Sequence, residues 1–79
     1  MLSAKVDAAR LQEIREERGL STTQLAALLS AELGRTVHQS TVSKHENGAR
    51  QPRPDMFNAM CRVLNVERDE LLLPAKANA

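Results

Sequence analysis

Apolar residues recur along this chain at the spacing of helix faces, and no segment alternates between apolar and polar residues as a half-buried strand does. In the first helical segment, about residues 6–18, Leu11, Ile14 and Arg18 share one face. Gly19 follows at once, and glycine readily takes the left-handed conformation that ends a helix. The pattern therefore predicts a first helix that stops at Gly19.

A second helix is predicted to begin after Ser21, whose side chain is a favourable N-cap. Its apolar positions are Leu25, Leu28, Leu29 and Leu33. Because Leu33 lies four residues after Leu29 and Gly34 then offers a stop, residues 30–33 continue the helical register. We therefore expect the second helix to run to about Leu33, and we expect Leu33 to cover the edge of the core.

A third, short helix is predicted over residues 39–46, and it stops at Gly48. Its residue Val42 and the preceding Val37 are expected to anchor it to the core, with Thr41 half-buried between the two environments. The remaining side chains of this helix are polar. Two helices joined by a turn, the second with a polar outer face, are typical of a helix-turn-helix, whose second helix enters the major groove of DNA.

Two prolines, Pro52 and Pro54, predict a loop and then the first turn of a fourth helix. The apolar face of this helix consists of Phe57, Met60, Cys61 and Leu64. Asn65 is expected to close the helix in a left-handed conformation, and Val66 then returns to the core. Residues 67–72 predict a short fifth helix.

The five predicted helices fill one short chain. At 79 residues there is room for one domain with one modest core. We therefore predict an all-α fold and a single domain over residues 1–79, with a folded core of about residues 6–73. Residues 1–5 and 75–79 are expected to be loose.

Composition excludes several classes of protein. Phe57 is the only aromatic residue, which argues against a protein that holds single strands by base stacking. Apolar runs are too short to span a membrane, and no basic-then-apolar signal peptide opens the chain. The single cysteine, Cys61, cannot build a disulfide framework, so a reducing cytoplasm is the expected compartment.

Charge is distributed unevenly along the chain, although the net charge is only +1. Residues 35–62 carry five basic and two acidic residues, a net charge of +3. Residues 1–34 carry four basic against five acidic residues, and residues 63–79 carry two against three. The positive segment coincides with the predicted third helix and the loop after it, and concentrated positive charge attracts a phosphate backbone.

Several short motifs occur together in one order. They are the segment 11–21 (LQEIREERGLS), the pair Leu25 and Ala26, the segment 40–48 (STVSKHENG), the segment 64–66 and the segment 69–72. In this order they resemble the Cro and phage-repressor family of helix-turn-helix proteins, also called the Xre family. The resemblance covers about residues 8–73, and it implies a five-helix, lambda-repressor-like DNA-binding domain.

The chain departs from the family pattern in two ways. Thr22 stands where the family usually has a glutamine that helps to hold a phosphate, although threonine still offers a hydroxyl donor. The separation of Leu25 from Glu46 is also longer than in ordinary members. This longer turn resembles that of the POU-specific domain, whose third helix likewise opens with a glutamine.

The resemblance implies which residues touch DNA. The expected base contacts are Gln39, Ser40, Ser43 and Lys44, since glutamine can pair bidentately with adenine and lysine can donate to guanine O6 and N7. The expected phosphate contacts are Thr22, Thr23, Arg35, His38, Thr41, Arg50 and Arg53, helped by the N-terminus of the second helix. The alternative interpretation is a solvated surface helix with arginines that serve only solubility.

The resemblance also implies an ion pair between the first and third helices, from Arg15 to Glu46. Arginine suits this position because its guanidinium group binds a carboxylate with two parallel hydrogen bonds. The alternative is two separate surface charges.

Three residues, His38, His45 and Cys61, raise the question of a metal site or a catalytic pair. They form no paired ligand motif such as Cys-x-x-Cys. The chain also has no glycine-framed nucleophile and no glycine-rich phosphate loop. We therefore expect no metal site, no cofactor and no enzymatic activity.

The sequence thus predicts a transcription regulator, a repressor, that binds double-stranded DNA as a homodimer on a palindromic operator. The candidate dimer residues are apolar beyond the needs of the core, and they are Met1, Leu2, Leu72 and Leu73. A cytoplasmic, DNA-associated protein encoded by a bacterium or a phage is expected. Two alternatives stay open, namely an antitoxin that autoregulates its operon while it binds a toxin, and a protein-interaction module that has lost DNA binding.

Overall fold

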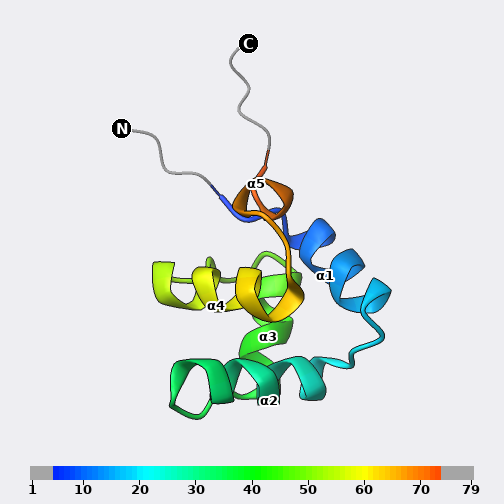
Figure 1. Cartoon of the computed structure of the whole chain (residues 1–79). Coiled ribbons are helices and arrows are strands. Elements are labelled where there is room, and N and C mark those ends of the chain that lie inside the picture. Colours follow the sequence, from blue (N-terminus) through cyan, green and yellow to red (C-terminus); the bar gives the residue numbers. More distant parts are fainter. Residues whose placement is uncertain (1–4, 74–79) are drawn as a thin grey trace.

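Five helices make up most of residues 5–73, the part of the chain that this computed structural model describes (Figure 1). They are α1 (Ala8–Glu17), α2 (Thr22–Leu33), α3 (Gln39–Glu46), α4 (Pro54–Leu64) and α5 (Arg68–Leu71). The predicted all-α fold and the order of the five helices are therefore confirmed.

The helices pack around α3, which lies between the other elements. The helix α2 contacts both α3 and α4, and α1 contacts α3 on another side. The short helix α5 packs against α1 and α4 at the end of the molecule where both ends of the described chain lie (Figure 1). This arrangement buries α3 on several sides and leaves one of its faces exposed.

The core contains apolar side chains from all five helices. Its buried residues are Val6, Leu11, Ile14, Leu25, Ala26, Leu29, Val37, Val42, Met56, Phe57, Ala59, Met60, Leu64 and Leu71. Leu28, one of the four apolar positions of the second helix, is 43% exposed. Successive helical residues are about 100° apart, so Leu28 lies at the margin of the stripe that Leu25, Leu29 and Leu33 form.

The second helix ends as predicted. It runs to Leu33, which packs partly buried against the core, and Gly34 closes it with a left-handed φ of 70°. The predicted N-cap at Ser21 is confirmed, and it is part of a capping box that was not predicted. The Ser21 hydroxyl accepts a hydrogen bond from the Gln24 amide, and the Gln24 side chain accepts one from the Ser21 amide. The extra turn is therefore ordered helix.

The first helix is shorter than predicted at both ends. Its N-cap is Asp7, whose carboxylate accepts a hydrogen bond from the Arg10 amide at 3.1 Å. Arg18 does not lie on the buried face with Leu11 and Ile14, because it follows the last helical residue and is exposed. Its Nε donates instead to the Leu64 carbonyl at 2.9 Å, which joins the end of α1 to the end of α4.

A short antiparallel contact joins the two ends of the described chain, and the sequence did not predict it. Val6 and Leu72 form an isolated β-bridge, and the Leu73 amide donates to the Lys5 carbonyl at 2.9 Å. The expectation of a loose Lys5 was therefore wrong, since its backbone is paired. Residue Leu72 leaves helical geometry to make this bridge, so α5 ends at Leu71. The expectations for residues 1–4 and 75–79 lie outside the described residues.

The end of α4 follows the prediction. Pro54 occupies its first turn, and Asn65 closes it with a left-handed φ of 57°. The Val66 amide then donates to the Cys61 carbonyl at 3.0 Å, and the Val66 side chain packs against the core. This closure satisfies a carbonyl that the helix end would otherwise leave free.

Candidate nucleic-acid interface

The helix α3 presents a polar stripe to solvent. At about 100° per residue, Gln39, Ser40, Ser43 and Lys44 fall within one sector of the helix. Three of these side chains are exposed and Ser43 is half-buried. The structure therefore brings together the four residues that the sequence analysis assigned to base contacts.

The opposite side of α3 is buried. Val42, His45 and Glu46 are all enclosed, and Thr41 is half-buried as expected. A helix with one polar, exposed face and one fixed, buried face holds its outer side chains in a defined register. Such a helix suits the recognition of a rigid surface.

An ion pair joins α3 to α1. Arg15 Nε lies 2.5 Å from Glu46 Oε2, and Arg15 Nη2 lies 3.0 Å from Glu46 Oε1, so the pair is bidentate. Arg15 and Glu46 are 8% and 9% exposed, respectively. The Glu46 carboxylate raises the pKa of Arg15, chiefly through this hydrogen bond. The third donor of Arg15, Nη1, reaches the Leu20 carbonyl at 2.6 Å.

A hydrogen-bond network joins the start of α3 to the start of α2. Gln39 Nε2 donates to Thr22 Oγ1 at 3.1 Å and to Ser43 Oγ at 3.0 Å. Both amide hydrogens of Gln39 are therefore directed at hydroxyls, and only its Oε1 is free. Bidentate pairing with adenine needs the amide nitrogen as a donor, so this contact requires Gln39 to release one of the two hydroxyls.

The loop after α3 folds back over the end of that helix. Gly48 has a left-handed φ of 80°, and the Ala49 and Arg50 amides both donate to the Lys44 carbonyl. His45 Nδ1 donates to the Arg50 carbonyl at 2.9 Å. A carbonyl only accepts, so the proton of neutral His45 is on Nδ1. Burial lowers the pKa of His45, although this hydrogen bond acts in the opposite direction.

His45 is a structural residue that the sequence analysis missed. The sequence carried one signal for it, because position 45 lies three residues after Val42 and so falls on the same buried face. Its partner is a backbone carbonyl, which no residue pattern reveals. The hydrogen bond fixes the path of the loop that carries Arg50 and Arg53.

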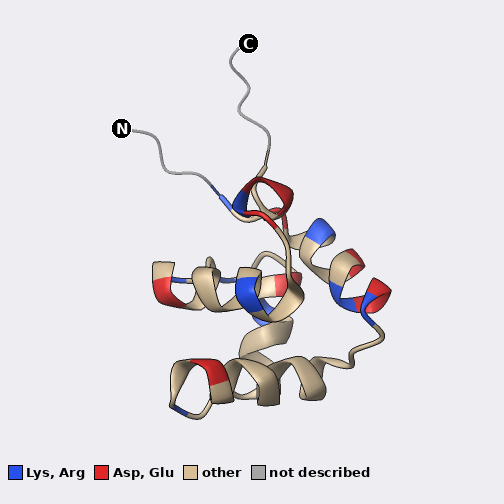
Figure 2. Cartoon of the chain, viewed as in Figure 1, with Lys and Arg blue, Asp and Glu red and all other residues tan. Residues whose placement is uncertain are grey.

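Positive charge without a carboxylate partner gathers beside the polar stripe. Within residues 5–73 no carboxylate lies within salt-bridge distance of Lys44, Arg50 or Arg53. Figure 2 shows acidic residues along α1 and α5, whereas α2 carries only the Glu32 carboxylate. Lys44, Arg50 and Arg53 therefore form a group of cations without carboxylate partners at the end of α3 and in the loop that follows.

Arg35 differs from these cations, because it is already in an ion pair. Its Nη2 lies 2.9 Å from Asp55 Oδ2, and both side chains are about half exposed. This hydrogen bond lowers the pKa of Asp55. Arg35 was expected to contact a phosphate, and in this structure it reaches from the connector after α2 to the start of α4 instead.

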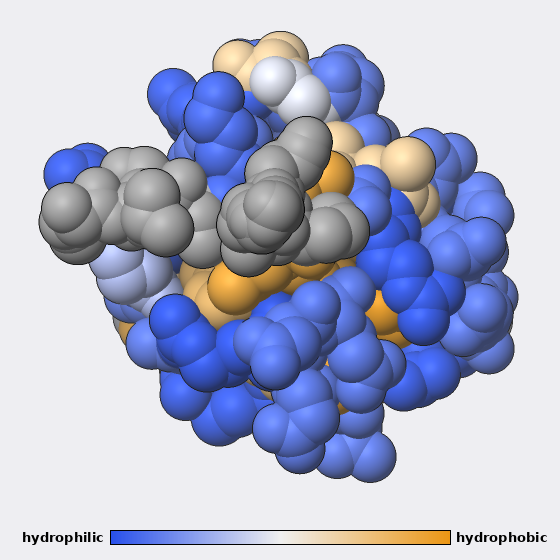
Figure 3. Space-filling model, turned by 90° about the horizontal axis from the view of Figure 1, so that it is seen from above, coloured by the Kyte–Doolittle hydropathy of each residue, from blue (hydrophilic) through white to orange (hydrophobic). Residues whose placement is uncertain are grey.

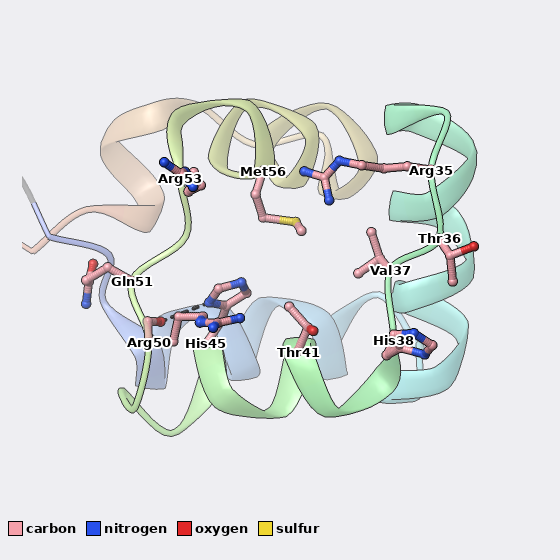
Figure 4. A pocket seen from close by; sticks show the side chains of 10 residues that line it. All are labelled: Arg35, Thr36, Val37, His38, Thr41, His45, Arg50, Gln51, Arg53 and Met56. Atoms are coloured by element: carbon pink, nitrogen blue, oxygen red, sulfur yellow. Dashed lines mark hydrogen bonds between the residues drawn. The ribbon is translucent and has the colours of Figure 1, made fainter.

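The remaining expected phosphate contacts lie at two places. Thr22 and Thr23 form the first turn of α2, where the backbone amides have no partner within the helix. His38 is the N-cap residue of α3, although its side chain makes no capping hydrogen bond. Thr41 lies on the flank of α3, close to Arg50 and His45 (Figure 4).

A pocket of about 350 Å³ lies beside α3, between that helix, the connector after α2 and the first turn of α4 (Figure 4). Five of its lining residues are basic, namely Arg35, His38, His45, Arg50 and Arg53. Val37 and Met56 supply apolar surface. None of the residues that line the pocket is acidic.

The residues considered for metal binding or nucleophilic chemistry do not share one site, because His38 and His45 line the pocket and Cys61 does not. Cys61 is half-buried on α4, and burial raises the pKa of its thiol, which disfavours the reactive thiolate. Within residues 5–73 no group of three or more His, Cys, Asp or Glu side chains could hold a metal ion. In the same range no helix has the length and apolar content to cross a membrane.

Comparisons with known proteins identify the family. The model of a family described as a helix-turn-helix domain matches residues 8–73. The crystal structure of the restriction-modification controller protein C.AhdI from Aeromonas hydrophila is 27% identical, with a TM-score of 0.62 over 80% of this chain and 86% of that chain. The crystal structure of Bacillus thuringiensis PlcR in complex with the peptide PapR7 and DNA is 28% identical, with a TM-score of 0.67 over 87% of this chain and 23% of that chain. No curated protein matches the chain.

The family match covers all five helices, including the extended α2 and the exposed stripe of α3. The two solved structures have the same fold over most of this chain. These findings confirm the resemblance to Cro and phage-repressor proteins that the sequence motifs indicated. The chain belongs to the helix-turn-helix domain family.

Proposed function

We propose that this protein is a transcription regulator that binds specific sites in double-stranded DNA and acts as a repressor. The observation that carries the proposal is the exposed polar stripe of α3 with unpaired cations next to it. The helix-turn-helix family and the likeness to PlcR, whose structure contains DNA, support DNA binding and transcription regulation. The helix α3 enters the major groove in this proposal.

Base recognition belongs to the exposed stripe. Lys44 donates from the second turn of α3 to guanine O6 and N7, and it is free to do so because no carboxylate of residues 5–73 holds it. Gln39 offers its Oε1 to an exocyclic amine of adenine or cytosine while its amide group stays on Thr22 and Ser43. Ser40 and Ser43 add short-range hydroxyl contacts.

Phosphate contacts lie on both sides of the stripe. On one side, the amides and hydroxyls of Thr22 and Thr23 meet a phosphate at the N-terminus of α2, where the helix dipole favours an anion. On the other side, Arg50 and Arg53 face the backbone from the loop after α3. Arg35 joins them when it leaves Asp55, and His38 and Thr41 complete the set.

We further propose that two copies bind a palindromic operator. A single domain of this size buries limited surface on DNA, so a second copy raises the affinity. The candidate dimer surface lies at the α5 end, where Leu73 is 48% exposed and Leu72 is half-buried. Figure 3, seen from that end, shows apolar surface among hydrophilic residues. The other candidates, Met1 and Leu2, lie outside the described residues.

Selection of bound sequences from random duplex DNA tests this function. The expected result is a two-fold symmetric motif that the full chain binds as a dimer, as measured by sedimentation of the complex. Binding without any enriched motif would contradict base recognition by α3. The absence of duplex binding at low salt would favour a protein-interaction module, and a small protein that co-purifies with the chain would favour an antitoxin.

A further inference from the structure

The pocket beside α3 has a composition that the DNA-reading stripe does not explain. Its basic lining comes from three separate segments, the connector after α2, the end of α3 and the loop after α3. Figure 4 shows Arg35, Arg50 and Arg53 around one opening, with Met56 and Val37 between them. Val37 and Met56 are 7% and 5% exposed, so the apolar part of the pocket belongs to the core surface.

The pocket is displaced from the stripe of α3. Thr41 and His45 line it, and at about 100° per residue they lie outside the sector from Gln39 to Lys44, on the flank next to Lys44. A ligand in the pocket therefore does not need to touch the bases that the stripe reads. The volume of about 350 Å³ is within the range of small-molecule sites.

The charges of the pocket favour an anion. Arg50 and Arg53 have no carboxylate partner within residues 5–73, and Arg53 and Met56 line the pocket from the start of α4. The carboxylate of Asp55, which does not line the pocket, holds Arg35. Two free guanidinium groups and a third that one carboxylate restrains are complementary to a doubly charged group such as phosphate.

We propose that this pocket binds a small phosphate monoester whose short apolar part rests on Val37 and Met56. The ligand takes Arg50 and Arg53, which also serve the DNA backbone in the proposed function. Occupancy therefore weakens DNA binding, and the pocket makes the regulator responsive to a phosphorylated small molecule. Ligand binding itself does not depend on the proposed DNA function, whereas the competition does.

The first test uses the full chain without DNA and phenyl phosphate as the probe. Amide chemical shifts are followed by NMR at constant ionic strength. Inorganic phosphate and phenol, each of which carries one part of the probe, are the control ligands. We expect saturable shifts around the pocket with phenyl phosphate, and binding of inorganic phosphate that is weaker by about tenfold or more, since it lacks the apolar group. The absence of saturation, or equal affinity for phenyl phosphate and inorganic phosphate, would overturn the proposal.

Four variants separate the pocket from general surface charge. Arg53→Gln is expected to lower the affinity for phenyl phosphate by about tenfold, as for one lost charge-assisted hydrogen bond. Asp55→Asn is expected to raise the affinity for phenyl phosphate, because it releases Arg35 and removes a negative charge. Arg18→Gln, which removes a cation at the opposite end of α4, and Lys44→Gln, which alters only the stripe, are expected to leave probe affinity unchanged. Equal losses for Arg53→Gln and Arg18→Gln would show diffuse charge attraction and would overturn the proposal.

A second readout addresses competition with DNA. Phenyl phosphate is expected to lower affinity for the selected duplex more than inorganic phosphate at the same ionic strength, and Arg53→Gln is expected to remove this difference. If Arg53→Gln weakens DNA binding but no probe binds the free protein, the pocket serves only the DNA backbone and the small-molecule site is disproved. If the probe binds and no duplex does, the ligand site stands and the proposed DNA function fails.

Discussion

At the scale of single residues, the Arg15–Glu46 pair shows how the reading helix is oriented. Its two charges are nearly enclosed, and such pairs are costly to desolvate, so their net contribution to stability is small. Their geometric effect is larger, because three donors of Arg15 connect α1, the turn at Leu20 and the end of α3. The pair therefore fixes where α3 ends relative to α1.

Removal of one partner of this pair is expected to be strongly destabilising. Glu46→Ala leaves the nearly buried Arg15 guanidinium with the Leu20 carbonyl and the exposed Glu16 carboxylate 3.8 Å away, at a cost of about 3 kcal/mol in the free energy of unfolding. Urea unfolding of the single variants and of the double variant Arg15→Met/Glu46→Leu measures the effect. The double variant is expected to recover part of the loss, whereas strictly additive losses would contradict a coupled pair.

The buried histidine makes stability depend on pH. Because burial lowers the pKa of His45 in the folded chain, the unfolded chain binds a proton first as the pH falls below about 6.5. The contribution of neutral His45 to the free energy of unfolding is therefore fully present above about pH 6.5. Below that pH the free energy of unfolding decreases, by up to about 1.4 kcal/mol per pH unit for one proton.

Urea unfolding between pH 7.5 and 5.5 measures this dependence, with His45→Gln as the test variant and His38→Gln as the matched control for an exposed histidine. We expect the loss to disappear in His45→Gln and to persist in His38→Gln. A slope that is the same in all three proteins would contradict the role of His45.

At the scale of the elements, the long turn is held by one serine. Ser30 Oγ donates to the Ala26 carbonyl at 2.8 Å and accepts a hydrogen bond from the Val37 amide at 2.8 Å. The extra turn of α2 thus holds the connector that leads into α3. Glu32 adds an ion pair to Arg62 of α4 at 2.5 Å.

Deletion of residues 30–35 is expected to cost about 2 kcal/mol or more, because it removes the packed Leu33. Specific DNA binding should fall further than the lost stability explains, since α3 loses its orientation. If the deletion variant does not fold, Ser30→Ala tests the same claim, with an expected loss of about 1 kcal/mol in thermal or urea unfolding.

The matched control for this claim is Ala31→Gln, on the exposed face of the same turn, with an expected change of less than about 0.5 kcal/mol. A deletion variant that melts like the parent and binds the same operator would mark the segment as a dispensable loop.

The helix ends that could be predicted from the sequence depend on the conformation or side chain of a single residue. Gly34 and Asn65 end helices through their own backbone conformation, and Ser21 begins one through its own hydroxyl. The contacts that were not predictable join residues far apart in the chain. The bridge between Val6 and Leu72 depends on how α5 packs against α1, and no pattern within either segment contains that information.

The candidate site shows the same division. The stripe of α3 follows from a 3.6-residue period, so the exposure of Gln39 and Lys44 could be predicted from the sequence. The partner of Arg35 could not, because Asp55 lies twenty positions later and meets it only when α2 and α4 pack together. The contacts of Gln39 with Thr22 and Ser43 likewise depend on the distance between the starts of α2 and α3.

At the scale of the whole molecule, the cations of the described residues divide into those with and those without a carboxylate partner. Arg10, Arg15, Arg35 and Arg62 have carboxylate partners. Arg68 donates a hydrogen bond to the side-chain carbonyl of Asn58, and its guanidinium group lies over the Phe57 ring, 4.9 Å from the ring centre. The cations left without such partners at α3 and its following loop give a nearly neutral chain one locally positive surface.

The central claim is that α3 reads bases while the loop after it holds phosphates. The most direct measurement is the affinity of Lys44→Ala for the selected duplex and for a scrambled duplex of equal composition, by fluorescence anisotropy, with Arg53→Ala as the phosphate-contact comparison. We predict that Lys44→Ala loses about 1–3 kcal/mol of binding free energy on the selected duplex and little on the scrambled one. Arg53→Ala is expected to lose the same binding free energy on both duplexes. Equal losses of Lys44→Ala on the two duplexes would contradict the claim.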